Sequence, residues 1–506
     1  MEKSDLLKLQ NGSDIRGIAL EGIADEHVNI TEEACRKIGG AFALWLAKKT
    51  KKNVSELKVG IGRDSRISGP SLEAAIAQGL LCQGVKVVRC SMATTPAMFM
   101  SIVFDQTKFD GSVMITASHL PFNRNGVKFF DADGGLEHED ITAILEAAAG
   151  IDAEKASGAD LSKCESFDLI EVYAAHLRNA ICKGLSSSEQ EKPLSGLKIV
   201  VDAGNGAGGF FAEKILAPLG CCIDGSQFLE PDGSFPNHIP NPENKAAMES
   251  IQKATVDSKA DLGLIFDTDV DRMSAVLSDG SEVNRDAIIA LVAAILTPDY
   301  PDSTIITDSV TSDRLTYFLE EVLHLHHLCY MRGYKNVINK QKELNAAGKV
   351  CPLAMETSGH GALLENYFLD DGAYLAVKMV VALAKAKKNG GSLKSLIEKL
   401  PPLVEEGEYR FKIKAEDFKS YGKSVLSEFK KRAEEKGYVV PENFEGVRLL
   451  FKGEDVKGWI LLRMSLHDPV MPLNIEGSRK GDLAKLVKIA GELLEGFTEL
   501  DVSVLK

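Results

Sequence analysis

The strongest constraint on the fold is a repeated order of segments, in which a short apolar strand, a helical segment and a second strand follow one another. Residues 57–61 alternate as a strand, residues 71–81 have helical spacing, and residues 85–90 return to a strand pattern. The same order starts again near residue 197 and near residue 303. This alternation predicts α/β domains, each with a largely parallel sheet that helices cover on its faces.

The chain is long enough for several such domains. Its 506 residues favour roughly three or four domains. After Gly390-Gly391 and Pro401-Pro402 the composition changes to charged helices and alternating strands, which indicates an antiparallel α+β domain. We therefore expect α/β domains over residues 1–160, 161–300 and 301–402, followed by an α+β domain over residues 403–506.

Composition excludes several classes of function. The 59 Lys and Arg residues against 73 Asp and Glu residues give a net charge of −14, which disfavours general binding to nucleic acid or to an anionic membrane. No apolar run reaches the length of about 18 residues that a membrane span needs. The nine cysteines form no CxxC pair and predict neither a disulfide framework nor a zinc site. We expect a soluble protein of a reducing compartment, either the cytoplasm or an organelle stroma after removal of a transit peptide.

The first candidate site residue is Ser118, which follows an apolar strand ending at Ile115. Pro121, Asn123 and Gly126 then indicate a turn, so the serine is expected where α/β proteins place ligand contacts, at the carboxyl end of a strand. The alternative is a hydroxyl group that bonds only to the backbone of its own loop.

A second apolar strand, residues 261–266, runs into three aspartates at alternate positions. Side chains at this spacing lie on one side of an extended chain, where their mutual repulsion favours a bridging cation. Three carboxylate ligands, with other oxygen atoms completing the coordination, suit Mg²⁺. The pattern is not an EF-hand, because it lacks the glycine and the glutamate of that loop. The alternative is a solvated acidic turn. The three candidate ligands are Asp267, Asp269 and Asp271.

Other polar clusters follow predicted strands. Residues 204–209 are rich in glycine but match neither a dinucleotide fingerprint nor a P-loop, so we interpret them as a tight, closely packed turn. Residues 356–361 (Glu-Thr-Ser-Gly-His-Gly) follow a third buried strand. Near the C-terminus, Arg463 and Ser465 have the chemistry of a phosphate site, although an arginine on a strand is often merely solvated.

The chain resembles the α-D-phosphohexomutases, a family that includes phosphoglucomutase, phosphomannomutase and phosphoglucosamine mutase. The resemblance covers nearly the whole chain and rests on motifs in the family's order and spacing. The motifs are residues 13–17, 62–69, 116–121, 125–129, 202–206, 267–272, 356–360 and, less strongly, 463–469. It implies four domains around a central cleft, three of related α/β build and a fourth like the TATA-binding protein.

The resemblance also implies a reaction, in which a phosphoserine at residue 118 transfers its phosphoryl group and a sugar bisphosphate is the intermediate. Hexose 1-phosphate and hexose 6-phosphate are interconverted, with glucose or mannose as the sugar. Mg²⁺ and a sugar bisphosphate activator are the implied cofactors. The implied partner of this monomer or homodimer is a hexose phosphate, with no nucleic acid and no membrane.

The roles that the resemblance implies can be given residue by residue. Ser118 and the three aspartates hold the metal. The groups around the transferred phosphoryl group are Arg16, His119, Lys128 and Arg272, with His119 or Lys128 moving the proton. Those that bind the sugar and the second phosphate are Glu356, Ser358, His360, Arg463 and Ser465.

One motif departs from the family pattern. The family's last loop usually reads Arg-x-Ser-Gly-Thr-Glu-Pro, whereas residues 466–468 here are Leu-His-Asp, and Pro472 stands where a later arginine is usual. A loop glycine lets backbone amides approach a phosphate, and threonine adds a hydroxyl donor. The alternative function is therefore a catalytically weak or inactive sugar-phosphate-binding regulatory protein with an altered phosphate loop.

Overall fold

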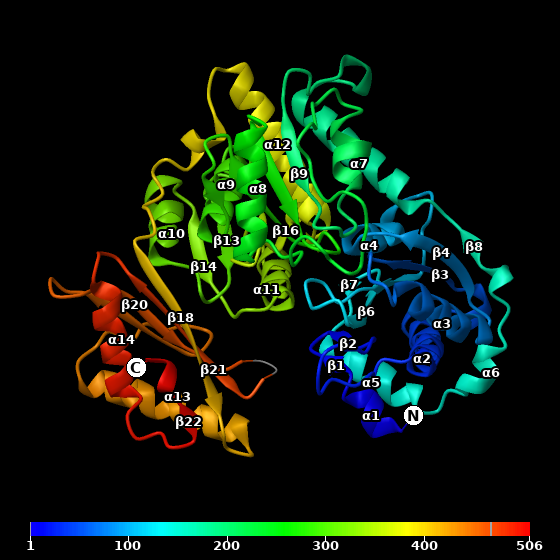
Figure 1. The fold of residues 1–506 in the computed structure, drawn as a ribbon, viewed down its shortest axis with the longest axis horizontal. Coiled ribbons are helices and arrows are strands. Elements are labelled where there is room, and N and C mark those ends of the chain that lie inside the picture. Colours follow the sequence, from blue (N-terminus) through cyan, green and yellow to red (C-terminus); the bar gives the residue numbers. More distant parts are fainter. Residues whose placement is uncertain (1, 466–467, 506) are drawn as a thin grey trace. The chain divides into compact units, whose positions relative to one another are not determined.

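The computed structural model describes residues 2–465 and 468–505, and the chain forms two compact units. Unit 1 comprises Met1–Ile288 and Ser358–Ser395, and unit 2 comprises Ile289–Thr357 and Leu396–Lys506. The expectation of α/β domains followed by an α+β domain is confirmed (Figure 1). The four expected domain ranges stay a prediction.

The first sheet of unit 1 contains the predicted β-α-β order. Its strands lie in the order β1-β2-β6-β5-β3-β4-β8, with β7 beside β6. The strands β5, β3, β4 and β8 are parallel, whereas β6 and β2 run antiparallel to their neighbours. The bounds are β1 Gln10–Asn11, β2 Asp14–Ile18, β3 Lys58–Arg63, β4 Lys86–Met92, β5 Gly111–Ile115, β6 Arg124–Asp131, β7 Gly134–Gly135 and β8 Glu165–Ser166.

Helices pack against this sheet because each has an apolar face. Apolar residues at helical spacing predict a helix over residues 31–48, and α2 begins there after Thr31, whose side chain accepts a hydrogen bond from the Ala34 amide. Phe42 and Phe129 pack with ring centroids 4.5 Å apart, and burying a side chain of this size stabilises the fold by about 1.5–3 kcal/mol. The bounds are α1 Lys3–Leu7, α2 Glu32–Thr50, α3 Gly69–Cys82, α4 Thr95–Val103, α5 His138–Ala148, α6 Ala153–Ser157 and α7 Leu169–Leu185.

The second sheet of unit 1 has the order β12-β11-β10-β9. Strand β10 is parallel to β9 and antiparallel to β11. The sequence pattern predicts a helix over about residues 210–219, after the glycine-rich turn, and the structure forms a π-helical segment there, η4, over Phe211–Leu216. The other bounds are β9 Ile199–Asp202, β10 Leu262–Phe266, β11 Met273–Leu277, β12 Glu282–Val283 and α8 Lys245–Asp257. Later residues of unit 1 form the antiparallel pair β16 Gly361–Leu363 and β17 Leu369–Asp370 and the helix α12 Gly372–Lys388, whereas α9 Asp286–Leu296 begins in unit 1 and continues in unit 2.

The glycine-rich stretch after β9 is a tight turn, as the sequence analysis interprets it. Gly204 and Asn205 both have left-handed backbone, with φ of +53° and +59°. A Cβ atom at Gly206 would lie 2.6 Å from the carbonyl oxygen of Thr268, and the Ala207 amide donates to that oxygen at 2.8 Å. The glycines therefore let this turn pack directly against the aspartate loop.

Unit 2 begins with three parallel strands, β14, β13 and β15. Its second part is an antiparallel sheet in the order β19-β20-β21-β18-β22. Helices α13 and α14 bury their apolar residues in one core with this sheet. The bounds are β13 Thr304–Thr307, β14 His326–Cys329, β15 Leu353–Met355, β18 Glu405–Ile413, β19 Val447–Lys452, β20 Lys457–Leu462, β21 Val470–Gly477, β22 Leu500–Asp501, α10 Asp313–Tyr317, the π-helical η5 Phe318–Val322, α11 Tyr334–Ala346, α13 Phe418–Glu435 and α14 Asp482–Leu493.

Two further features concern the whole described chain. All nine cysteines are free thiols. A search of the described helices finds none with both the length and the apolar composition that a bilayer span requires.

Candidate active site

Ser118 lies in the loop after β5, where the sequence places it. Its backbone is left-handed with φ of +50°, and only 2% of the residue is exposed. Left-handed backbone is uncommon for residues other than glycine and persists where neighbouring groups hold it. The Ser118 amide donates to the Thr116 Oγ1 at 2.9 Å, which is one such contact.

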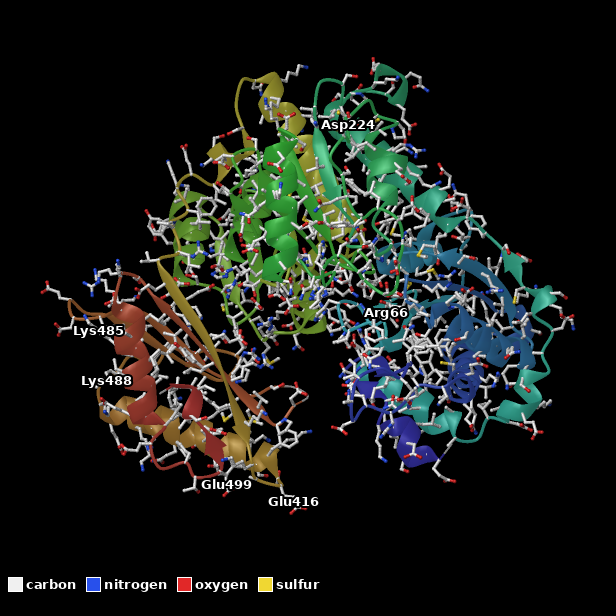
Figure 2. All side chains as sticks on the ribbon, viewed as in Figure 1. Arg66, Asp224, Glu416, Lys485, Lys488 and Glu499 are labelled. Carbon is white, nitrogen blue, oxygen red and sulfur yellow. The ribbon has the colours of Figure 1, made fainter. Side chains whose placement is uncertain are left out.

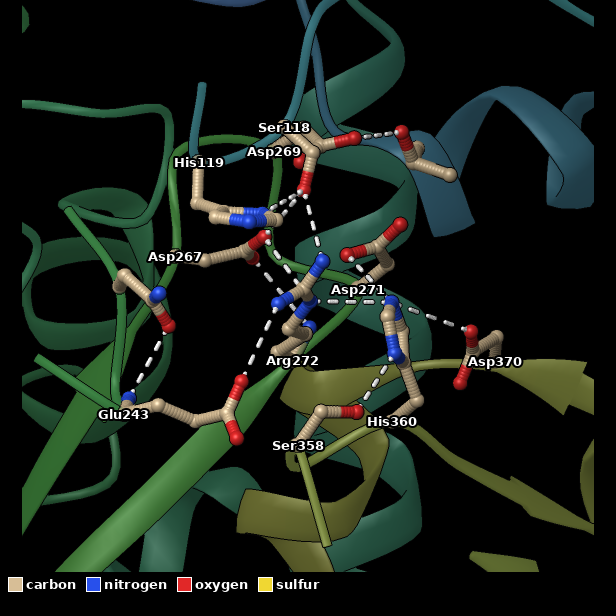
Figure 3. A network of polar contacts seen from close by, with 12 residues as sticks. Ser118, His119, Glu243, Asp267, Asp269, Asp271, Arg272, Ser358, His360 and Asp370 are labelled. Atoms are coloured by element: carbon tan, nitrogen blue, oxygen red, sulfur yellow. Dashed lines mark hydrogen bonds and ion pairs between the residues drawn. The ribbon is translucent and has the colours of Figure 1, made fainter. Parts of the chain in front are cut away.

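The hydroxyl group of Ser118 faces residues that are distant in sequence (Figure 3). Its Oγ donates to the Asp267 Oδ2 at 3.0 Å and accepts from the Arg272 Nη2 at 3.3 Å. The His119 Nδ1 lies 3.3 Å from the same oxygen. The alternative of a hydroxyl that serves only its own loop is therefore wrong for this residue.

The three aspartates converge in the loop between β10 and β11. One carboxylate oxygen from each lies within 4.8 Å of the others, and all three residues are buried. Their alternate spacing predicts that these residues end a strand, but they form a tight turn in which Val270 has φ of +66°. The predicted convergence is correct, and a turn produces it instead of strand alternation.

The electrostatics of this cluster favour a cation. Burial and the repulsion of Asp271 and Asp269 raise the pKa of Asp267 well above its ordinary value. The Oδ1 atoms of Asp269 and Asp271 are buried and accept no hydrogen bond from the described residues. Two buried carboxylate oxygens without such a hydrogen bond, next to the third buried carboxylate of Asp267, match the preference of Mg²⁺ for hard oxygen ligands. The donor set thus fits the metal that the resemblance implies.

Two cations reach this region from neighbouring strands of the first sheet. Lys128 on β6 pairs in register with Met114 on β5, and its Nζ lies 2.5 Å from the Asp271 Oδ2 and 3.6 Å from the Asp269 Oδ2. Arg16 on β2 is opposite Gly126 on β6 and donates to the Asp14 Oδ2 at 2.8 Å. The order β2-β6-β5 therefore brings both side chains toward the serine loop.

His119 carries no charge in this surrounding. Arg272 and burial, with a further contribution from Arg16, lower the pKa of His119 to about 2. Burial acts to raise the pKa of Asp271, but Lys128 and His360 outweigh it and lower this pKa well below the ordinary range. Opposite charges and a neutral imidazole thus lie within one buried network of unit 1.

Arg272 links the serine and aspartate loops to a third segment of unit 1. Its Nε lies 3.0 Å from the His360 Nε2, and the His360 Nδ1 lies 3.0 Å from the Ser358 Oγ. Arg272 and His360 also form an isolated antiparallel bridge. Ser358 and His360 are thereby placed in the same network as Ser118, which is drawn in Figure 3.

Two residues of this network are absent from the sequence predictions. Thr95, at the start of α4, donates from its Oγ1 to the Asp269 Oδ2 at 2.5 Å. Its sequence context indicates only the beginning of a helix, so no signal identifies it. Asp370 lies 3.7 Å from the His360 Nε2 and ends strand β17. The rule that polar residues at strand ends form sites would have identified Asp370.

In unit 2 the parallel strands β13 and β15 bring Asp308 and Glu356 together at their carboxyl ends. Asp308 is fully buried and accepts from the Thr357 Oγ1 at 3.0 Å, with the Arg332 Nε 3.8 Å away. Glu356 accepts from the Gly333 amide at 2.6 Å. Asp308 was not predicted, although it follows a strand in the same way as Ser118 and Asp267.

The pKa of Asp308 predicts a pH dependence of stability. Burial, reinforced by Glu356, raises this pKa from 3.8 to about 7, although Arg332 opposes the shift. Between these values the folded state binds more protons than the unfolded state, so stability falls as the pH rises from about 4 to 7. Asp308→Asn cannot ionise, and the unfolding midpoint of this variant is expected to fall less between pH 5 and pH 8 than that of the wild type.

The measurement follows the fluorescence of Trp459, a buried residue of unit 2, in a Trp45→Phe background. Over this pH range the free energy of unfolding of the wild type should fall by a few kcal/mol more than that of Asp308→Asn, at about 1.4 kcal/mol for each pKa unit. Asp302→Asn, which changes an exposed residue of the same unit, is the matched control. Equal pH dependence in Asp308→Asn and the wild type would contradict the assignment.

The predicted phosphate residues lie in the C-terminal sheet of unit 2. Arg463 follows β20 and is 7% exposed, and its Nε has no hydrogen-bond partner in the described chain. Its Nη1 lies 3.8 Å from the Glu445 Oε1, and burial together with Arg332 lowers its pKa. The Ser465 amide donates to the Val470 carbonyl at 2.9 Å. Leu466 and His467, on which the departure from the family pattern falls, lie outside the described residues.

The structure thus assembles the predicted site residues in two groups. Unit 1 brings together the serine, the carboxylates, their cations and the Ser358–His360 pair, whereas Glu356, Arg463 and Ser465 belong to unit 2. The boundary between the units falls within the predicted sugar motif, after Thr357. The predicted meeting of all these residues in one site stays a prediction.

Comparison with protein families finds three adjacent matches. Residues 7–155, 171–280 and 284–403 match, in this order, α/β/α domains I, II and III of phosphoglucomutase/phosphomannomutase. Together these matches cover more than half of the chain. They identify three related α/β/α domains in the order that the sequence analysis expects.

Individual relatives extend over most of the chain. A phosphomannomutase/phosphoglucomutase of Pseudomonas putida is 30% identical, over 85% of this chain and 86% of its own. A phosphoglucomutase/phosphomannomutase of Thermococcus kodakarensis is 29% identical, over 94% of this chain and 97% of the relative. Among solved structures, a phosphoglucomutase/phosphomannomutase family protein of Burkholderia thailandensis is 25% identical, with a TM-score of 0.77 over 99% of both chains.

Proposed function

The chain belongs to the phosphoglucomutase/phosphomannomutase family, and from this premise we propose that it interconverts the 1-phosphate and 6-phosphate of glucose or mannose. Relatives that cover most of its length are named mutases, so the chain is an isomerase of carbohydrate metabolism that acts as a phosphohexomutase. The proposal adds the sugar, a phosphoserine at residue 118 and a sugar bisphosphate intermediate. The observation that carries it is the buried contact of the Ser118 Oγ with Asp267 and Arg272.

Transfer of a phosphoryl group requires alignment and neutralisation of charge more than covalent chemistry. In the proposed reaction the phosphoryl group of Ser118 passes to a hydroxyl oxygen of the sugar. The proton of that hydroxyl passes to the neutral His119, or to Lys128 once the lysine has given its own proton to the departing Ser118 oxygen. The resulting bisphosphate then reverses its orientation in the site. Its other phosphoryl group passes to the Ser118 oxygen, which restores the phosphoserine. Arg16 and Arg272 stabilise the oxygen atoms of the moving group, because guanidinium groups match them in charge and geometry.

We propose Mg²⁺ as the metal, held by Asp267, Asp269, Asp271 and an oxygen of the serine phosphate. When bound, this ion neutralises negative charge on the transferred group. One oxygen of each carboxylate lies within 4.8 Å of the others, although Lys128 approaches Asp269 and Asp271 and Arg272 approaches Asp267. A sugar bisphosphate is the proposed activator, because it can load the serine.

The remaining residues have proposed roles in holding the substrate. Glu356, Ser358 and His360 bind sugar hydroxyls, and Arg463 with Ser465 binds the phosphate that is not being transferred. The buried Nε of Arg463, which has no hydrogen-bond partner among the described residues, supports this role, since such a donor is costly and an anion would satisfy it. Because the bisphosphate reverses its orientation, the phosphate at either end of the sugar must fit both the transfer site at Ser118 and the second phosphate site.

The alternative, a weak or inactive binding protein, is not favoured. Three buried carboxylates within 4.8 Å repel one another, and a protein that only binds sugar phosphate has little physical need to retain them or the serine they face. The direct test is a coupled assay that converts glucose 1-phosphate to glucose 6-phosphate with Mg²⁺ and a bisphosphate activator. Absence of turnover with glucose, mannose and glucosamine phosphates would reject the proposed function.

Replacing Arg463 by lysine is expected to raise KM for the hexose phosphate by about tenfold with little change in kcat. A lysine ammonium cannot reproduce the planar two-oxygen contact of a guanidinium, and a charge-assisted hydrogen bond contributes about 1.5–3 kcal/mol. Loss of a contact that is equal in the ground and transition states changes KM alone. Arg410→Lys, at an exposed position of β18, is the matched control. A KM equal to that of the wild type would remove Arg463 from phosphate binding.

A further inference from the structure

We propose that Arg66 is a positioning residue that holds the Ser118 loop in the conformation used for phosphoryl transfer. Arg66 lies in the loop between β3 and α3 and is labelled in Figure 2. The inference rests on the proposed role of Ser118 and assigns Arg66 no contact with substrate or metal. Strands β5 and β3 are parallel neighbours, so the loops that follow them meet at one edge of the sheet.

The guanidinium of Arg66 is fully buried and bonds to four backbone carbonyls of the serine loop. Its Nη2 donates to the carbonyl oxygen of Ser118 at 2.5 Å and to that of Leu120 at 2.6 Å. Its Nη1 donates to the carbonyl oxygens of Pro121 at 2.7 Å and Arg124 at 2.9 Å. The loop backbone from Ser118 to Arg124 therefore surrounds one cation.

Ser118 is held from both sides by this arrangement. Its carbonyl oxygen bonds to Arg66, whereas its hydroxyl group bonds to Asp267. The residue between these contacts has left-handed backbone, which relaxes when the groups that hold it are removed. Arg66 thus restrains the carbonyl group of Ser118, whereas the hydrogen bond to Thr116 restrains only its amide.

Other residues fix the direction of the Arg66 side chain. The Asp64 Oδ1 accepts from the Arg66 amide at 2.9 Å, and the Asp64 Oδ2 forms an ion pair with the Arg66 Nε at 3.3 Å. The Phe235 ring lies 5.3 Å from the guanidinium carbon. A Cβ atom at Gly233 would come within 2.7 Å of the Arg66 Cα, so only glycine permits this approach. These contacts fix the orientation of the guanidinium independently of its bonds to the serine loop.

Lysine at position 66 cannot reproduce the four backbone contacts of the arginine. A guanidinium presents its donors in a rigid planar fork, whereas an ammonium has three donors on a single nitrogen and cannot reach four carbonyls spread over both ends of that fork. Arg66→Lys keeps the charge that Asp64 needs but releases part of the loop. Since displacing a reacting group by about 1 Å can lower the rate about 100-fold, the main effect is expected on kcat.

The experiment compares Arg66→Lys with the wild type and with Arg36→Lys, which changes an arginine on helix α2 that bonds to Gln78 and Glu32. We expect kcat of Arg66→Lys to fall about 100-fold with KM within about twofold of the wild type. Amide exchange of Leu120 and Arg124, whose bonds close turns of the loop, is expected to accelerate. Arg36→Lys should change neither quantity. A purely structural role would lower stability and leave kcat of the folded protein unchanged.

The outcomes separate this inference from the proposed function. A kcat for Arg66→Lys within twofold of the wild type, measured while Ser118→Ala is inactive, would overturn the positioning role and leave the function standing. Activity in Ser118→Ala would instead overturn the function. If Arg66→Lys is not recovered folded, Asp64→Asn takes its place, because the amide keeps the shape and weakens the hold on Arg66. A kcat at least about fivefold lower at constant KM is then expected, and an unchanged kcat rejects the inference.

Discussion

Ser118→Ala is expected to abolish turnover, with kcat lower by several orders of magnitude, while the protein stays folded. The hydroxyl oxygen is the proposed carrier of the phosphoryl group, and alanine offers no atom to which that group can bond. The side chain is small and its loop is held by Arg66 and Thr116, so its loss removes little packing. The expected effect is therefore on chemistry and not on the fold.

Two measurements check this expectation. The coupled assay gives kcat, and mass spectrometry after incubation with a sugar bisphosphate counts covalently bound phosphoryl groups. Ser112→Ala is the matched control, because Ser112 is a buried serine of β5 whose Oγ donates to the Met98 carbonyl oxygen at 2.6 Å. Full activity of Ser118→Ala, or unchanged phosphorylation of that variant, would remove Ser118 from the mechanism.

Asp269→Asn is expected to raise the Mg²⁺ concentration for half-maximal activity by about tenfold or more. The substitution replaces a charged ligand by a neutral amide of nearly the same shape. The Asp269 Oδ2 already accepts from Thr95, and its Oδ1 is the buried oxygen without a hydrogen bond in the described chain. The variant is therefore expected to fold while binding the metal less tightly.

Direct binding gives a readout that does not depend on turnover. A ligand that binds the folded state raises the unfolding midpoint, so Mg²⁺ should stabilise the wild type more than Asp269→Asn at equal concentration. Asp131→Asn, which changes a buried carboxylate of β6 that pairs with Lys49, is the matched control. An equal stabilisation of Asp269→Asn and the wild type by Mg²⁺ would reject this loop as the metal site.

Local sequence pattern predicted most of the elements that carry the site. The strands before Ser118, Asp267 and Glu356 were expected within a few residues of β5, β10 and β15, because alternation and apolar runs are local properties of a chain. The helix expected after the glycine turn is π-helical, and the aspartates lie in a turn instead of on a strand end. Neither feature has a periodicity that distinguishes it from the expected element.

Several site residues could not be predicted because their roles depend on contacts between distant segments. Thr95 has an ordinary helix-start context, and only the fold brings its hydroxyl to Asp269, 174 residues further along the chain. Asp308 acquires its raised pKa from burial and from Glu356, which a neighbouring parallel strand supplies. Arg66 was visible as part of a motif, but its four carbonyl partners were not.

The sequence by itself determined the α/β and α+β elements, the polar clusters at the strand ends and the family to which the chain belongs. These follow from periodicity and from the order of short motifs. The tertiary structure decided which clusters meet, that the Ser118 hydroxyl faces Asp267 across 149 residues, and that a buried arginine holds the serine loop. The physical reason is that burial, charge repulsion and hydrogen-bond geometry depend on distances in space, which strand order sets and local sequence does not.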